Sequence, residues 1–204
     1  MNALTIILII VIVVLAFWLC AQKVLYSRVL KKIKESEAVV ETKKGGNILR
    51  SLAISEKLSL SKLDGQATIA KAEDVFKSWI DPDFQNWGLS RKGKTTLETE
   101  VEVYEMVKNA NFKDIFTSLS DDLNLLCLTQ DQIIDFCKKH RSHLRQGGYG
   151  TFFLTKKDFE KPVTEDNLFV VSVRVDSFGL DVRVGHFGDA YVWDADRHRV
   201  VVSN

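Results

Sequence analysis

Apolar and polar positions divide the chain into three parts with different periods. Residues 3–21 are apolar and uncharged, residues 67–146 place apolar positions three or four apart, and residues 151–202 alternate. The first stretch is long enough to cross a hydrocarbon core of ~30 Å as a helix rising ~1.5 Å per residue. A cleaved signal peptide is the alternative, but its apolar core spans only about 7–15 residues. The pattern predicts a transmembrane anchor over residues 1–22.

Basic residues follow the apolar stretch, and none precedes it. They are Lys23, Arg28, Lys31, Lys32 and Lys34. Because positive residues stay on the cytoplasmic side of a membrane span, the N-terminus is expected outside and the rest of the chain in the cytoplasm. These side chains could also bind anionic lipid at the membrane surface, which makes the lipid bilayer an expected partner.

Residues 23–66 are expected to connect the anchor to a folded domain. Apolar positions up to residue 40 follow helical spacing, so a basic juxtamembrane helix comes first, and its Val/Leu/Ile stripe could support self-association. Gly45 and Gly46 then end this helix. Residues 48–63 fit neither period well, and we interpret them as a tether.

The middle of the chain has the spacing of amphipathic helices. We expect helices over residues 67–80, 96–109, 112–119 and 129–146. The last of these is the clearest, because Thr129 and Gln132 stand at the two positions of a reciprocal capping box.

The end of the chain has the period of two that is typical of β-strands. Strands are expected over residues 151–155, 168–176, 180–184, 190–193 and 199–202. Turn residues join the second and third strands into a hairpin, and the last two into another. Helices followed by an antiparallel β-meander predict an α+β domain over residues 67–204. Its sheet is expected to pack one face on the helices and to expose the other to water.

Charge and cysteine content add little to this picture. The formal net charge is +1, so no global field favours nucleic acid. Cys20, Cys127 and Cys137 are an odd set without the spacing of a disulfide framework. Free thiols are typical of the reducing cytoplasm, which agrees with the orientation expected from the basic residues.

One stretch matches a chemical motif letter by letter. Residues 88–95 read G-x-x-x-x-G-K-T, the phosphate loop, with Gly88, Gly93, Lys94 and Thr95 at its defining positions. In that motif the backbone cradles phosphates, the lysine reaches the β- and γ-phosphates, and the threonine holds Mg²⁺. The motif must follow a buried strand, whereas here the preceding residues include a proline and two aspartates. We interpret the stretch as a basic loop and keep nucleotide binding as an alternative.

Four residues are of types that bind zinc, namely Cys127, Cys137, His140 and His143. Zinc sites usually contain a C-x₂-C or an H-x₃-H pair, and neither pair is present in this sequence. Cys137 also falls within the apolar stripe of its predicted helix. We therefore interpret it as a core residue and assign no metal.

The same predicted helix ends in a basic run from Lys138 to Arg145, with Tyr149 nearby for stacking. Such a run could contact nucleic acid. It is also the ordinary composition of a solvated helix end, where basic side chains complement the helix dipole. We expect no nucleic-acid partner and keep this helix as a second alternative.

These observations predict a single-pass membrane protein whose small cytoplasmic α+β domain acts as an adaptor that binds a protein partner. No set of side chains forms an evident catalytic site, so neither an enzyme nor a cofactor is expected. The alternatives are a membrane-tethered nucleotide-binding enzyme that uses residues 88–95 and a nucleic-acid-binding module that uses residues 138–145.

Overall fold

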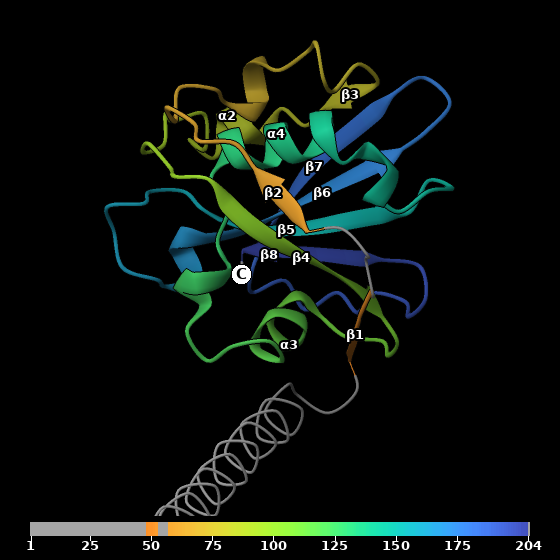
Figure 1. Ribbon diagram of the computed structural model, residues 1–204. Coiled ribbons are helices and arrows are strands. Elements are labelled where there is room, and N and C mark those ends of the chain that lie inside the picture. Colours follow the sequence, from red (N-terminus) through yellow and green to blue (C-terminus); the bar gives the residue numbers. More distant parts are fainter. Residues whose placement is uncertain (1–47, 53–56, 204) are drawn as a thin grey trace, which may run out of the picture. The chain divides into compact units, whose positions relative to one another are not determined.

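A mixed β-sheet of eight strands runs through the domain in a computed structural model that describes residues 48–52 and 57–203 (Figure 1). All described residues belong to one compact unit, Gly45–Asn204. The strand order is β1-β4-β8-β5-β6-β7-β3, and β2 also pairs with β4. The strands are β1 (Leu49–Ser51), β2 (Leu58–Leu60), β3 (Trp79–Ile80), β4 (Thr99–Met106), β5 (Gly150–Lys156), β6 (Leu168–Val175), β7 (Leu180–His186) and β8 (Arg199–Ser203).

The helices are short and lie on both faces of the sheet. Within the described ranges, the α-helices are α2 (Asp83–Asn86), α3 (Phe112–Thr117) and α4 (Gln130–Lys139). Short 3-10 helices add η1 (Ile69–Lys71), η2 (Leu123–Leu126), η3 (Arg141–His143) and η4 (Glu165–Asn167). Figure 1 shows α2 and α4 on one face of the sheet and α3 on the opposite face.

Both faces of the sheet are buried in hydrophobic cores. Phe136 of α4 packs in one core with Phe153, whereas Phe116 of α3 packs in the other core with Phe152. Phe152 and Phe153 are consecutive in β5, so the period of two sends their side chains to opposite faces. The prediction that one face is exposed to water is wrong, because α3 and the residues around it cover that face.

Strand β4 replaces the helix that the spacing predicts over residues 96–109. Val101 and Val103 belong to the core on the α4 face, and Tyr104 and Met106 to the core on the α3 face. This is the two-sided alternation of a central strand. The same apolar residues also fit a helical spacing of three or four, which is why the prediction was wrong.

The helix expected over residues 67–80 is also wrong. These residues form η1 and then β3, which pairs in parallel with β7 at the edge of the sheet. Residues 48–63, interpreted as a tether, contribute β1 and β2, and both are antiparallel to β4. Strands β1, β2 and β3 are therefore too short for their own hydrophobic pattern to show a period, and they form by pairing with longer strands of the sheet.

Strand β8 lies in the middle of the sheet and not in a second hairpin. It is antiparallel to β4 and parallel to β5. Its expected partner segment, residues 190–193, makes an isolated bridge from Trp193 to Ala110. Val200, Val201 and Val202 are all buried, as expected for a strand covered on both faces. The fold is therefore a mixed sheet with short helices, and the predicted α+β order of several helices followed by an antiparallel meander is wrong.

Local predictions with strong end signals are confirmed. Helix α4 begins after Thr129, and the capping box between Thr129 and Gln132 is formed. Strands β6 and β7 form the expected antiparallel hairpin. Within it, Arg174 and Asp181 pair across the strands at 2.7 Å.

The predicted membrane anchor, residues 1–22, lies outside the described residues, as do Lys23, Arg28, Lys31, Lys32 and Lys34. No helix in the described ranges is long and apolar enough to cross a membrane. The longest of them, α4, has 10 residues, whereas a span needs about 20. This finding contradicts the prediction of a single-pass membrane protein with a cytoplasmic domain.

Candidate functional site

The 88–95 loop connects a short helix to a strand, so its setting differs from that of a nucleotide phosphate loop. It follows α2 and leads into β4, and no helix begins at Thr95. Gly88 has a φ of 69°, in the left-handed region that glycine adopts without strain. The loop folds back on α2, where the Phe84 carbonyl accepts a hydrogen bond of 3.0 Å from the Ser90 N–H.

A chain of hydrogen bonds from α4 supports this loop. Asp131 Oδ2 accepts a hydrogen bond of 3.0 Å from the Gly65 N–H. The Gly65 carbonyl in turn accepts one of 2.8 Å from the Gly93 N–H. A Cβ on Gly65 would lie 2.5 Å from the Lys94 carbonyl oxygen, so the close approach requires glycine. The position of the loop therefore depends on a carboxylate that is distant in sequence.

The loop forms one wall of a basic pocket with a volume of about 240 Å³. The segment that follows β5 forms the other wall, and Figure 1 shows both segments at the left-hand end of the sheet. The charged side chains that line the pocket are Arg91, Lys92, Lys94, Lys156, Lys157, Asp158 and Glu160. Five cations and two anions give this basic pocket a formal net charge of +3.

Lys156 is a buried cation without a carboxylate partner in the described part of the chain. Its side chain is largely enclosed, and the residue is 6% exposed. The Nζ donates hydrogen bonds to Asn124 Oδ1 at 3.0 Å and to the carbonyls of Phe159 and Lys161, both at 3.3 Å. These three acceptors satisfy its N–H groups, but they are neutral. The Phe159 ring, whose centre lies 5.1 Å from Nζ, adds a cation–π contact, but no carboxylate of the described residues pairs with the ammonium group. Its field reaches further than that of an exposed lysine because burial reduces screening.

The outer cations of the basic pocket are exposed and loosely held. Arg91 Nη1 lies 3.7 Å from Asp158 Oδ2, near the limit of an ion pair. Lys94 Nζ lies 6.0 Å from the centre of the Phe159 ring, at the edge of cation–π range. Such side chains lose little when they turn toward a bound anion.

The two cysteines among the candidate zinc ligands lie on opposite sides of the sheet, while His140 directly follows α4 and His143 ends η3. Cys127 belongs to the core on the α3 face and Cys137 to the core on the α4 face. Burial raises the pKa of Cys127 to about 12 and also raises the pKa of Cys137, so both thiols stay protonated at neutral pH. No group of three or more His, Cys, Asp or Glu residues could hold a metal ion among the residues that the structure describes.

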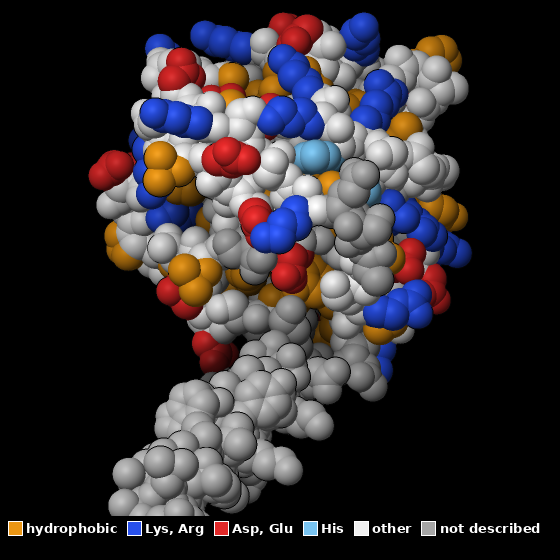
Figure 2. Space-filling model, viewed as in Figure 1, with side chains coloured by type: hydrophobic (Ala, Val, Ile, Leu, Met, Phe, Trp, Pro, Cys, Tyr) orange, Lys and Arg blue, Asp and Glu red, His pale blue; other side chains and the backbone are white. Residues whose placement is uncertain are grey.

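The basic run over residues 138–145 is largely paired within the domain. The ion pairs are Lys138–Asp74 at 3.0 Å, Lys139–Asp135 at 3.2 Å and Arg145–Glu105 at 2.9 Å. On the face shown in Figure 2, Lys and Arg side chains are interspersed with Asp and Glu side chains. The paired carboxylates Asp74, Asp135 and Glu105 would lie beside a bound nucleic acid and repel its phosphates, which weighs against such a role.

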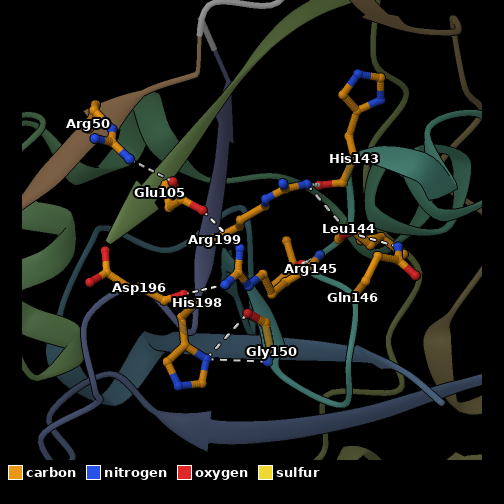
Figure 3. A network of polar contacts seen from close by, with 11 residues as sticks. Arg50, Glu105, His143, Leu144, Arg145, Gln146, Gly150, Asp196, His198 and Arg199 are labelled. Carbon is orange, nitrogen blue, oxygen red and sulfur yellow. Dashed lines mark hydrogen bonds and ion pairs between the residues drawn. The ribbon is translucent and has the colours of Figure 1, made fainter. Parts of the chain in front are cut away.

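Arg145 also belongs to a polar network that joins three strands and a loop (Figure 3). Glu105 of β4 pairs through one oxygen with Arg145 and through the other with Arg50 of β1, both at 2.9 Å. Arg199 of β8 donates from Nη1 to the His143 carbonyl at 2.8 Å. These contacts connect parts of the domain to one another, and we assign the network a structural role.

The sequence alone indicates one wall of the basic pocket, the 88–95 loop, and gives no sign of the other wall, which follows β5. The motif points to the 88–95 loop, but no pattern points to Lys156, Asp158 or Phe159. Lys156 stands as the last residue of a buried strand, and only the fold shows that no carboxylate among the described residues pairs with it. Comparison with known proteins adds no further residue, since no family model, curated protein or solved structure matches the chain.

Proposed function

We propose that this domain is a binding module for an anionic, phosphate-bearing ligand and that the basic pocket is its binding site. The observation that carries the proposal is the buried charge of Lys156, which no carboxylate of the described residues pairs with, in a lining with net charge +3. Burying an ammonium group without a counter-ion costs free energy, and a bound anion would offset that cost. The proposal concerns recognition and assigns no chemical step to the domain.

The two kinds of cation have different tasks in this proposal. Lys156 already uses its N–H groups on neutral acceptors, so it attracts the anion by charge alone. Lys92 and Lys94 are exposed and supply donors that reach the anion directly. A volume of about 240 Å³ is below the range of about 300–1,000 Å³ for drug-sized ligands, so the pocket suits an anionic group better than a whole nucleotide.

Calorimetric titration of the full chain with glucose 6-phosphate tests the proposal. Lys94→Ala removes one exposed cation and is expected to weaken binding about fivefold, equivalent to about 1 kcal/mol. Lys138→Ala is the matched control, because it removes a lysine that is paired with Asp74 and does not line the pocket. Raising the salt concentration should weaken binding to the unmodified chain, since screening shortens the reach of the exposed cations.

Two results would contradict the proposal. The first is that the unmodified chain fails to bind phosphate esters at low salt, which would show that the pocket is not a phosphate-binding site. An equal loss of affinity in Lys138→Ala and Lys94→Ala would show that binding follows total charge and not the pocket. A parallel titration with ATP and Mg²⁺ tests the nucleotide-binding alternative, which requires much tighter binding of ATP than of the sugar phosphate.

A further inference from the structure

A second pocket adjoins the basic pocket. It has a volume of about 290 Å³, and Arg91, Lys157 and Asp158 line both pockets. Lys161 and Asp166 line only the second. Because three residues form a shared wall, the two pockets are neighbouring compartments of one cleft.

Asp158 lies in the shared wall and is held there by hydrogen bonds. Its N–H donates to Asn167 Oδ1 at 2.9 Å, and its Oδ1 accepts from the Glu160 N–H at 3.0 Å. Its Oδ2 faces two cations at long range, Arg91 at 3.7 Å and Lys161 at 4.0 Å. The Asp158 side chain is 23% exposed, whereas those of Arg91 and Lys161 are 60% and 69% exposed. The carboxylate is therefore held in place while both cations can move.

The charges on the two sides of this wall favour two anions that are kept apart. The second compartment is lined by the cations Arg91, Lys157 and Lys161 and by the carboxylates Asp158 and Asp166, which gives a formal net charge of +1. An anion there would draw Arg91 and Lys161 away from Asp158, and their pairs with that carboxylate are loose and exposed and so contribute little. An anion beside Asp158 itself would be repelled by the carboxylate. Neutral groups that donate hydrogen bonds, such as hydroxyls, suit that central position, because a carboxylate only accepts.

We propose that the cleft binds an organic molecule with two phosphate groups separated by a neutral, hydroxyl-bearing spacer. One phosphate lies in the basic pocket near Lys94, the other lies near Lys161, and the spacer passes Asp158. This inference rests on the proposed phosphate-binding function and adds the class of ligand to it.

Titration of the full chain with fructose 6-phosphate, fructose 1,6-bisphosphate and pyrophosphate tests the inference. The bisphosphate should bind about tenfold more tightly than the monophosphate, and more tightly than pyrophosphate, whose two phosphates are adjacent. Lys161→Gln should weaken binding of the bisphosphate about threefold to fivefold and affect the monophosphate clearly less, whereas Lys94→Ala should weaken both. Asp158→Asn removes the carboxylate charge between the two compartments, so the ratio of the affinities for the bisphosphate and for pyrophosphate should fall.

The outcomes separate this inference from the proposed function. The inference of a bisphosphate ligand is contradicted if the bisphosphate binds no more tightly than the monophosphate, or if Lys161→Gln leaves the affinity for the bisphosphate unchanged. Binding of the monophosphate would still support the proposed phosphate site. If none of the three compounds binds to the folded chain, both proposals fail. The exposed Lys161 side chain makes Lys161→Gln safe for folding, and its backbone carbonyl still accepts from Lys156.

Discussion

His198 is a titratable side chain buried among aromatic rings. The Phe152 ring stacks on it with centroids 4.8 Å apart, and the Trp193 ring meets it edge-on at 5.1 Å. Its Nδ1 lies 3.2 Å from the Gly150 amide nitrogen and 3.3 Å from the Gly150 carbonyl oxygen, so it accepts from the first when neutral and donates to the second when protonated. Burial lowers the pKa of His198, and it outweighs the Gly150 carbonyl, which favours the protonated ring by accepting a hydrogen bond from it. The charged groups that also act on the ring are Asp194, Arg145 and Arg197.

The lowered pKa predicts that stability falls as the solution becomes acidic. In the unfolded chain this histidine takes up a proton near pH 6.5, whereas the folded chain takes it up only at lower pH. The contribution of His198 to the free energy of unfolding is therefore complete above about pH 6.5 and is lost as the pH falls toward the lowered pKa. His198→Asn keeps an acceptor for Gly150 but cannot titrate, so the loss should shrink in this variant.

Urea unfolding between pH 5 and pH 8 measures this difference. The other three histidines are present in both proteins, so their contributions cancel in the comparison. Equal slopes of unfolding free energy against pH would show that His198 is not the group responsible.

At the scale of elements, α4 shows how a predictable helix acquires a role that its sequence does not reveal. Gln130 and Asp131 are buried although they are polar. Their side chains accept hydrogen bonds from backbone N–H groups of a distant segment, at Ile69 and Gly65. The hydrophobic pattern treats such residues as solvent-facing, because it contains no information about a segment that folds over them.

Substitution of Asp131 separates the hydrogen bond from the charge. Asp131→Ala leaves the Gly65 N–H without its acceptor and should lower the free energy of unfolding by about 1–3 kcal/mol. Asp131→Asn keeps an amide oxygen there and avoids burial of a charge, which is the main cause of the raised pKa of Asp131. It should therefore be clearly more stable than Asp131→Ala in urea unfolding at pH 7.

The same pair of variants tests the support of the basic pocket. Because Gly65 holds Gly93, Asp131→Ala should also weaken binding of glucose 6-phosphate, while Asp131→Asn should retain it. Similar stability of the two variants would mean that water replaces the lost acceptor and that the loop does not depend on Asp131.

The whole molecule is held together by contacts between strands that are far apart in sequence, and Glu105 occupies the centre of one such set. Its side chain is 15% exposed and pairs with Arg50 and Arg145. Burial, and next the charge of Arg145, lower the pKa of Arg199, which shows how crowded the cations are around this carboxylate. Removal of the charge would leave these arginines without their anion.

Two glutamates of β4 allow a matched test of this network. Glu105→Gln should lower the free energy of unfolding by about 2–3 kcal/mol, because the partly buried guanidinium group of Arg145 loses its charged partner. Glu100→Gln breaks the exposed pair with Lys57, in which the side chains are 47% and 81% exposed, and should cost less than about 1 kcal/mol. Equal costs in chemical denaturation would show that the network adds nothing beyond a surface ion pair.

By itself, the sequence determined the structure that depends on neighbouring residues. The capping box at Thr129 and the hairpin of β6 and β7 follow from signals a few positions apart, and both are present in the fold. The spacing of β4 allowed either a helix or a strand. Only pairing with β1, β2 and β8 decides between them, because burial on two faces becomes possible within the sheet.

The tertiary structure alone decided where the charges are compensated. Lys138, Lys139 and Arg145 belong to a basic run in the sequence, yet each has a carboxylate partner in space. Lys156 belongs to no basic pattern in the sequence. In the fold it is a buried cation whose three hydrogen-bond acceptors are all neutral. Electrostatic interaction depends on distance and burial, and the fold sets both when it brings β5 beside the 88–95 loop.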